Sequence, residues 1–298
     1  MDLEAESPED VLTLLSQADY VADTATATTV LLADRLGKPI LIEGPPGCGK
    51  TELAKALAES TGSDLVRLQC YRGLDTENAV YEWDYMKQFL RIRAEGETDA
   101  AVDPADIEDS IFEEEYLLER PILKALRNGD RSVLLIDEID RAGEDFEAFL
   151  LEVLDEFQIS IPELGTVSAD DPPLVVLTSN RTRKIGDALK RRCVYLYLDH
   201  PSPEKELEIV RTRVPSLDST LSERVVEFMQ ALRRREEFLR TPGVAETIDW
   251  ATALAEIGAT ELTTDKVVQS LGTVLKEPQD IESLDEERIE ALIQSIEN

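Results

Sequence analysis

The chain has 298 residues, enough for one large domain or two smaller ones, and its apolar fraction of 42% is ordinary for a globular protein. Its 63 acidic and 31 basic residues give a formal net charge of -32, which repels nucleic-acid phosphates and argues against simple DNA or RNA binding. The acidic residues are spread along the whole chain, and lysine is scarce relative to arginine, which indicates a halophilic protein adapted to high salt. An ordinary acidic cytosolic protein is the alternative.

The predicted elements begin with a helical segment over residues 1–24, which carries no targeting signal. Its acidic start lacks the basic region and the apolar core of a signal peptide. Three scattered cysteines indicate a reducing interior without a disulfide framework, and no apolar run approaches the length of a membrane span. We therefore expect a cytoplasmic protein with no membrane partner.

A glycine-rich stretch follows the first predicted strand, residues 39–43, and leads into a predicted helix. Its glycines let backbone N–H groups converge on phosphate oxygens, and the N-terminus of the helix adds partial positive charge. In this pattern Lys50 reaches the β- and γ-phosphates and the hydroxyl of Thr51 ligates Mg²⁺. An ordinary glycine- and proline-rich turn is the alternative. The predicted nucleotide-binding residues are Gly44, Pro45, Pro46, Gly47, Cys48, Gly49, Lys50, Thr51 and Glu52.

The segment after the second predicted strand, residues 65–70, has an unusual composition. Aromatic and polar residues alternate over residues 80–94, which predicts an exposed two-stranded hairpin inserted in the α/β domain. Residues 95–110 are acidic and indicate a mobile loop or a short acidic link, and a helix is predicted over residues 113–127. A second small hairpin is expected over residues 159–167.

Two carboxylates end a buried strand predicted over residues 132–138. In a nucleotide site, the strand-end Asp137 holds Mg²⁺ and the adjacent Glu138 orients and polarises the attacking water. A solvated acidic turn is the alternative. Asn180 ends the next buried strand, where its amide can position the water and sense the γ-phosphate, although an asparagine that closes a strand into a turn is also common.

Arg191 and Arg192 precede the last predicted strand, residues 194–198. Phosphoryl transfer spreads charge over the equatorial oxygens, and a guanidinium from outside the site can stabilise that charge. We expect at least one of the two to act in this way, and the sequence does not say which. A cation that faces the helix dipole is the alternative. An arginine acting in trans requires the protein to oligomerise.

Beyond His200 the pattern changes from strands and helices to helices alone. We predict an α/β fold with a five-stranded parallel sheet between helices over residues 25–200, followed by a small helical domain over residues 203–298. Its helices are expected over residues 203–213, 221–236, 246–257, 264–275 and 285–296.

The ordered set of glycine loop, acidic strand end, strand-end asparagine and paired arginines resembles the AAA+ ATPases, which have a P-loop domain and a helical lid. The resemblance extends over residues 25–260 or so, and three stretches are similar to the MoxR branch, whose hairpin insert lies where residues 80–94 are found here. The MoxR-like stretches are residues 41–51, 137–142 and 161–165. Three further stretches resemble the CoxD-like subgroup, namely residues 68–75, 81–85 and 243–247.

The resemblance implies an enzyme that hydrolyses ATP with Mg²⁺ and forms a hexameric ring with its active sites at subunit interfaces. It also implies a chaperone-like remodeller of a protein client, often with a von Willebrand factor A-type partner. The CoxD-like subgroup is associated with maturing the metal centre of molybdenum hydroxylases such as carbon monoxide dehydrogenase.

One position departs from the family pattern. AAA+ lids usually supply a second sensing arginine near the start of a lid helix, whereas the matching place here reads Val244-Ala245-Glu246-Thr247. The carboxylate of Glu246 would repel a γ-phosphate, and Arg240 a few residues upstream is the candidate substitute. This departure puts lid-coupled sensing in question, but not ATP binding.

Two other classes of function are open alternatives. One is a nucleotide-gated switch that binds a partner without turnover. The other is a DNA-associated AAA+ motor, which the net charge of -32 opposes. An intact carboxylate at Glu138 favours hydrolysis over the switch.

Overall fold

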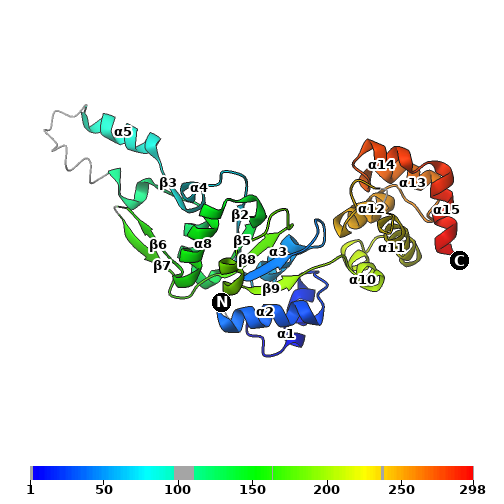
Figure 1. Cartoon of the computed structure of the whole chain (residues 1–298), viewed down its shortest axis with the longest axis horizontal. Helices are drawn as coiled ribbons and strands as arrows, with labels where there is room; N and C mark the ends of the chain where they lie inside the picture. The colour runs from blue at the N-terminus through cyan, green and yellow to red at the C-terminus, as the bar shows by residue number, and fades with distance from the viewer. Residues whose placement is uncertain (1–2, 97–110, 163, 236–237, 298) are drawn as a thin grey trace. The chain divides into compact units, whose positions relative to one another are not determined.

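The computed structural model describes residues 3–96, 111–162, 164–235 and 238–297, and Figure 1 shows its helices and strands. The chain divides into two compact units. The first unit comprises Met1–Val11, Thr24–Glu43 and Ala54–Leu196, and the second comprises Leu12–Asp23, Gly44–Leu53 and Tyr197–Asn298. The predicted domain boundary near residue 200 stays a proposal.

A five-stranded parallel sheet is the centre of the first unit, in the strand order β2-β5-β8-β1-β9, and it confirms the predicted α/β fold. Every residue of the three middle strands is buried, as expected for continuous apolar strands. Because the strands are parallel, their carboxyl ends lie at one edge of the sheet. The strands are β1 (Ile40–Glu43), β2 (Asp64–Gln69), β5 (Ser132–Asp137), β8 (Leu174–Ser179) and β9 (Val194–Tyr197).

The helix α7 (Pro121–Asn128) packs against β2 and β5 and supplies part of the core. Its buried Ile122 and Leu123 join Leu134 and Ile136 of β5 in one apolar cluster. The other helices described before residue 200, apart from α5 and α8, are α1 (Pro8–Gln17), α2 (Thr24–Leu36), α3 (Lys50–Ser60), α4 (Thr76–Val80) and α9 (Asp187–Arg192).

The helix α8 (Glu144–Glu156) contributes Phe146 and Leu150 to the same cluster. A small hairpin follows it, made of β6 (Gln158–Ile161) and β7 (Gly165–Ser168). Its strands pair antiparallel, which confirms the second hairpin that the sequence predicts.

The prediction of a hairpin over residues 80–94 is wrong. Only β3 (Tyr81–Trp83) is a strand; it pairs with β4 (Leu117–Glu119), and the rest forms the helix α5 (Tyr85–Gly96), which extends away from the sheet in Figure 1. Asp84 caps α5, since its carboxylate accepts a hydrogen bond of 2.9 Å from the backbone N–H three residues further on. The exposed apolar side chains also recur at helical spacing, as Tyr85, Met86, Phe89 and Leu90.

The helix predicted over residues 113–127 begins only at Pro121. The chain first forms the short turn η1 (Glu114–Tyr116) and then β4, and the proline occupies the first position of α7, where its missing N–H costs nothing. The predicted mobile or acidic link falls mostly on residues 97–110, which lie outside the described residues.

The five predicted C-terminal helices are all present in the second unit. The fourth departs from expectation, because its α-helix ends at Ser270 and continues as the 3-10 turn η4 (Leu271–Thr273). An additional short helix begins at Pro278, which again fits a first helical position. The helices are α10 (Pro203–Arg213), α11 (Ser219–Arg233), α12 (Val244–Glu256), α13 (Thr264–Ser270), α14 (Pro278–Ser283) and α15 (Glu286–Glu297).

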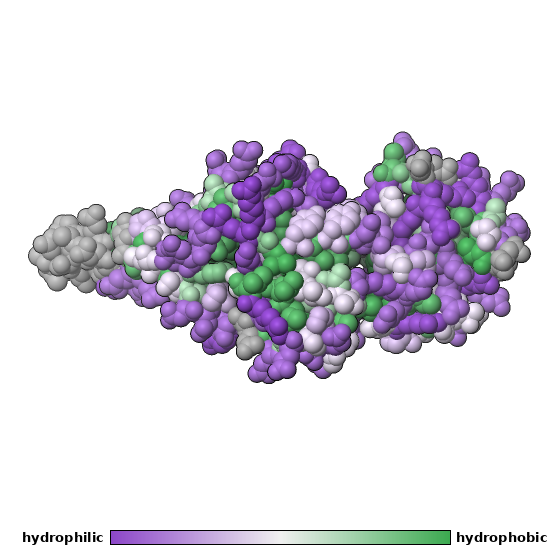
Figure 2. All heavy atoms as spheres, turned by 60° about the horizontal axis from the view of Figure 1, so that its bottom comes forward, coloured by the Kyte–Doolittle hydropathy of each residue, from purple (hydrophilic) through white to green (hydrophobic). Residues whose placement is uncertain are grey.

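The surface of the chain is strongly polar. Figure 2 shows hydrophilic residues over most of the visible face, in keeping with the formal net charge of -32. Within the described ranges, no helix combines the length and the apolar character needed to cross a bilayer.

A buried ion pair ties three helices of the second unit together. Glu206 on α10 is 0% exposed, and Arg233 on α11 donates to its two carboxylate oxygens at 2.5 and 2.6 Å. The hydroxyl of Thr247 on α12 donates at 2.6 Å and the amide of Gln230 at 2.7 Å. A buried charge is stable only when it is paired and hydrogen-bonded in this way.

Replacing Glu206 with alanine is expected to lower the free energy of unfolding by about 3 kcal/mol, because the guanidinium of Arg233 stays buried without its partner. Denaturant unfolding followed by circular dichroism measures the change. Glu208→Ala removes an exposed carboxylate from the same helix and should have little effect. Equal midpoints for the two variants would contradict this role of the pair.

Candidate functional site

The glycine loop follows β1 in the chain and leads into α3. Gly47 and Gly49 have φ angles of +75° and +96°, which residues with a Cβ rarely adopt. Lys50 is 6% exposed, and its Nζ donates to the carbonyl oxygens of Gly44 at 2.9 Å and Pro45 at 2.6 Å. The loop therefore holds the ammonium of Lys50 against its own carbonyl oxygens.

The packing around the loop explains two of its residues. A Cβ at Gly44 would lie 1.9 Å from the carbonyl oxygen of Leu198, so only glycine fits there. Burial raises the pKa of the Cys48 thiol, although the charge of Lys50 acts in the opposite direction. A thiol that stays protonated is a small space-filling group rather than a redox centre.

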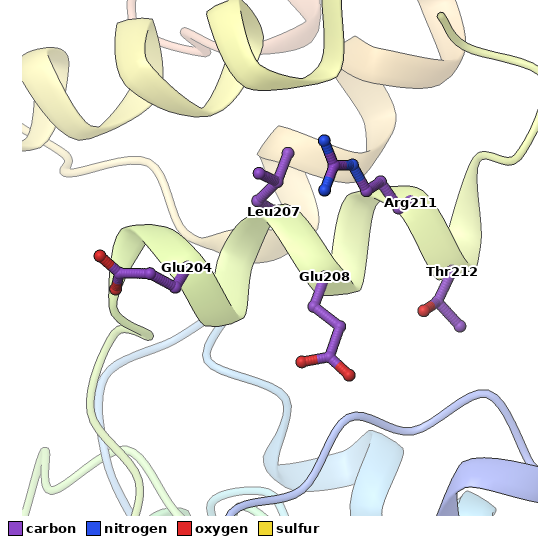
Figure 3. A pocket seen from close by; sticks show the side chains of 5 residues that line it. All are labelled: Glu204, Leu207, Glu208, Arg211 and Thr212. Atoms are coloured by element: carbon purple, nitrogen blue, oxygen red, sulfur yellow. The ribbon is translucent and has the colours of Figure 1, made fainter. Parts of the chain in front are cut away.

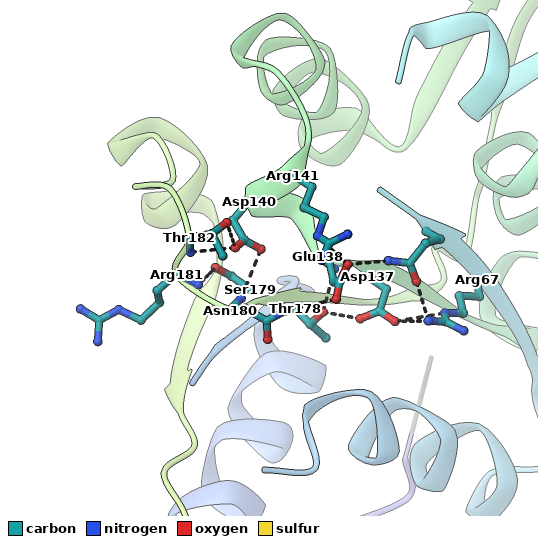
Figure 4. Close-up of polar contacts among 11 residues, drawn as sticks. Arg67, Asp137, Glu138, Asp140, Arg141, Thr178, Ser179, Asn180, Arg181 and Thr182 are labelled. Atoms are coloured by element: carbon teal, nitrogen blue, oxygen red, sulfur yellow. Dashed lines mark hydrogen bonds and ion pairs between the residues drawn. The ribbon is translucent and has the colours of Figure 1, made fainter. Parts of the chain in front are cut away.

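Asp137 ends β5 and is 3% exposed, and Figure 4 shows the contacts that hold it. The hydroxyl of Thr178 on β8 donates to one carboxylate oxygen at 2.5 Å. Arg67 on β2 donates to the other oxygen, from Nε at 3.1 Å and from Nη2 at 2.6 Å. The carboxylate is thus oriented from both neighbouring strands.

Glu138 follows in the left-handed conformation, with φ 57° and ψ 49°, and its backbone N–H donates to the hydroxyl of Thr178 at 3.0 Å. The side-chain amides of Gln69 and Asn180 donate to its two carboxylate oxygens at 3.0 and 3.2 Å. Nε of Arg141 lies 2.9 Å from one of them. A residue keeps such an unfavourable backbone conformation only where surrounding contacts stabilise it. The contacts of Glu138 also fix the orientation of its carboxylate.

A third carboxylate, Asp140, fixes the segment after β8. It accepts hydrogen bonds from the backbone N–H groups of Asn180 at 3.2 Å and Thr182 at 2.9 Å, and from the hydroxyl of Thr182 at 2.6 Å. Burial acts to raise the pKa of Asp140, but these hydrogen bonds outweigh it and hold the pKa below its ordinary value. The ionised Asp140 therefore keeps Asn180 beside Glu138.

Glu43, the last residue of β1, forms a further buried contact. It is 4% exposed and accepts hydrogen bonds of 2.9 Å from Nζ of Lys190 on α9 and 2.9 Å from the hydroxyl of Tyr195 on β9. Nζ of Lys190 also lies 5.5 Å from the centre of the Tyr195 ring. These contacts connect the strand that precedes the glycine loop to the helix that carries the paired arginines.

Arg191 and Arg192 end α9 in different surroundings. Nε and Nη2 of Arg192 donate to the two carboxylate oxygens of Asp155 on α8, each at 2.5 Å. Arg191 is exposed, and no ion pair of its guanidinium is found within the described part of the chain. Arg192 is thus engaged within its own chain, whereas the side chain of Arg191 faces solvent.

The structure brings Asp137, Glu138 and Asn180 together at one edge of the sheet. Gln69 and Thr178 belong to the same arrangement and were not predicted. Gln69 is the register partner of Asp137 in the β2–β5 pair. Gln69 could have been noticed because it lies near the end of a predicted strand. Only the strand order, however, shows that this strand lies next to β5.

A pocket on α10, shown in Figure 3, includes none of the predicted site residues. All of its lining residues belong to this one helix. The lining residues are Glu204, Leu207, Glu208, Arg211 and Thr212.

The sequence of the chain is similar to a known family and to several known proteins. The family described as "ATPase family associated with various cellular activities (AAA)" matches residues 40–198, more than half of the chain. The gas vesicle ATPase GvpN of Haloferax mediterranei is 28% identical over 272 residues, covering 88% of this chain and 75% of GvpN. An uncharacterized protein of Staphylococcus aureus is 28% identical over 204 residues, covering 66% of this chain and 69% of that protein.

A mutant RuvB of Thermotoga maritima has a related solved structure. It has a TM-score of 0.50 and 18% sequence identity, and the similarity covers 95% of this chain and 72% of RuvB. At this level of identity, the likeness shows the fold alone.

Replacing Thr178 with valine tests the arrangement around the two carboxylates. The change keeps the shape of the side chain but leaves the half-buried N–H of Glu138 without its acceptor and removes a donor to Asp137. We expect a loss of about 1–3 kcal/mol in the free energy of unfolding, measured with denaturant. Thr166→Val, at an exposed hairpin position, is the matched control. A Thr178→Val protein as stable as the control would show that the hydroxyl is dispensable.

Proposed function

We propose that this chain binds ATP with Mg²⁺ and hydrolyses it, from the premise that it belongs to the AAA family of ATPases. The observation that carries the proposal is the group of Asp137, Glu138 and Asn180, joined by hydrogen bonds at the carboxyl edge of the sheet. A buried strand that ends in two oriented carboxylates, with an amide beside them, suits the hydrolysis of a phosphoanhydride bond.

The nucleotide would be held by the glycine loop from Gly44 to Glu52. The positive φ angles of Gly47 and Gly49 and the inward-turned ammonium of Lys50 fit a polyphosphate. Thr51 and Asp137 would hold Mg²⁺, a cation usually bound through one or two protein oxygens together with substrate phosphates. The metal would supply positive charge that neutralises the phosphates.

Glu138 would act on the attacking water as a general base, and Asn180 would position that water. Gln69, Asn180 and Arg141 each contact the carboxylate of Glu138, so its direction is set before the substrate arrives. Preorganised polar groups of this kind need no rearrangement at the moment of reaction.

We propose further that the chain forms a ring, a hexamer by resemblance, in which Arg191 contacts the nucleotide of the neighbouring subunit. The exposure of Arg191 supports this choice, whereas Arg192 is held by Asp155 of its own chain. A guanidinium placed against the phosphates would stabilise the charge that develops during transfer.

The work done by hydrolysis is proposed to be chaperone-like remodelling of a protein client in the cytoplasm of a halophile, with a von Willebrand factor A-type partner. The MoxR-like and CoxD-like stretches support this, and they favour maturation of a metalloenzyme such as a molybdenum hydroxylase. Similarity to GvpN over 88% of this chain favours a second candidate, an ATPase that acts on gas vesicle proteins.

Two substitutions separate binding from hydrolysis. Lys50→Ala should weaken ATP binding by about 10- to 100-fold, because it removes a charged donor to the phosphates. Glu138→Gln should bind ATP normally and lower kcat by about 100-fold or more, because it removes the general base. Equilibrium binding and phosphate release measure these effects in molar KCl. The exposed residues Lys55→Ala and Glu144→Gln serve as controls; full turnover by Glu138→Gln would overturn the assigned base.

Arg191→Ala should lower kcat by about 1,000-fold while ATP binding is retained, since an arginine acting in trans stabilises only the transition state. Arg192→Ala should lose the contact with Asp155 and have the smaller effect on kcat. Specific activity of the parent should rise with protein concentration as subunits associate. An activity independent of concentration, or a reversed order of the two variants, would contradict the trans role of Arg191.

A further inference from the structure

Within the second unit, the start of α12 lies directly against the glycine loop. The backbone N–H of Val244, the first residue of α12, donates to the carbonyl oxygen of Gly47 at 3.0 Å. A Cβ at Gly243 would meet the Cα, O and C atoms of Gly47 at 2.9, 3.0 and 3.1 Å. The two glycines therefore allow the main chains to approach more closely than side chains would permit.

Arg233 anchors this contact in the core of the helical unit. Its Nε donates to the carbonyl oxygen of Pro242 at 2.7 Å, and its Nη2 donates to that of Gly243 at 3.1 Å. The same guanidinium forms the buried pair with Glu206, which joins α10, α11 and α12. A displacement of the loop would therefore be passed to three helices at once.

Glu246 completes the contact. Its carboxylate accepts a hydrogen bond of 2.8 Å from the N–H of Gly243, which caps α12, and it lies 3.3 Å from a Cβ placed at Gly47. Nη2 of Arg240 lies 3.7 Å from the other carboxylate oxygen of Glu246. The arginine considered as a substitute sensor is thus engaged with the cap of α12.

We infer that the helical unit senses nucleotide through the loop–lid joint, defined as Gly47 and residues 243–246, rather than through an arginine at the γ-phosphate. The inference rests on the proposed ATPase function. Phosphates bound by the amides of the loop would fix the conformation of Gly47, and the hydrogen bond from Val244 would pass that change to α12. Such a joint responds to occupation of the loop, so ADP and ATP act alike on α12.

Val244→Pro removes the hydrogen bond from the N–H of residue 244 to the carbonyl oxygen of Gly47. Proline lacks the N–H but fits the first position of a helix, and Gly243 before it has φ -90° and ψ -170°, an extended conformation compatible with a following proline. We expect about fivefold weaker binding of both ATP and ADP, the effect of one hydrogen bond of ordinary strength. Thr264→Pro is the matched control at the first position of α13, after an extended Thr263, and should bind as the parent does.

Gly243→Ala tests the close approach by a different route. Its φ of -90° is allowed for alanine, so the cost arises from contact with Gly47 rather than from backbone strain. It should also weaken the binding of both nucleotides. Gly272→Ala is the control, since a Cβ there meets nothing within 4 Å.

Hydrogen exchange across residues 244–256, compared without nucleotide, with ADP and with ATP and Mg²⁺, reports the coupling itself. In the parent, both nucleotides should change the exchange of α12 to a similar extent. Val244→Pro and Gly243→Ala should lose this response at saturating nucleotide, whereas the two controls keep it. Circular dichroism melting of each variant shows that the helical unit remains folded.

The outcomes distinguish the joint from the function on which it rests. A parent that binds no nucleotide would refute the ATPase proposal and the joint with it. A parent that binds nucleotide, with unchanged affinity and exchange response in both joint variants, would refute the joint alone. A response to ATP only, abolished by Arg240→Ala, would assign the sensing to the arginine instead.

Discussion

The parallel register of the central sheet is the constraint on which the candidate site depends. Because β2, β5 and β8 run in the same direction, Gln69, Asp137 and Thr178 come together at one edge. The hydroxyl of Thr178 donates to the carboxylate of Asp137 and accepts from the backbone N–H of Glu138, so one side chain fixes two adjacent residues of the site. The same edge of the sheet influences the buried thiol of Cys70. Burial is the main cause that raises the pKa of this thiol to about 12, and the negative charges of Asp137 and its neighbours act in the same direction.

Close approach of main chains is the corresponding constraint in the second unit. Gly44 packs against the backbone of Leu198, and Gly47 packs against Gly243. Two glycines of the loop are therefore in close contact with backbone of the same unit, which limits the conformations open to the loop. This close packing is the basis of the proposed response of the helical unit to the loop.

Much of the fold and the main site residues could be predicted because their signals are local. Continuous apolar runs indicated the buried strands, and the residues that end them, such as Asp137 and Asn180, were identified by position. The insert was mispredicted because alternating residues near Tyr81 imitate a hairpin, whereas the true partner of β3 lies at Leu117–Glu119. Gln69 and Gly243 could not be found locally, since strand order and tertiary packing give them their roles.

The most direct measurement is a structure determined with Mg²⁺ and a non-hydrolysable ATP analogue. The account predicts that the glycine loop surrounds the phosphates with Lys50 beside the γ-phosphate. It also predicts that Mg²⁺ lies between Thr51 and Asp137, and that the carboxylate of Glu138 faces the γ-phosphorus across a water molecule. A nucleotide bound elsewhere, or bound in the loop with Asp137 and Glu138 directed away from its phosphates, would contradict it.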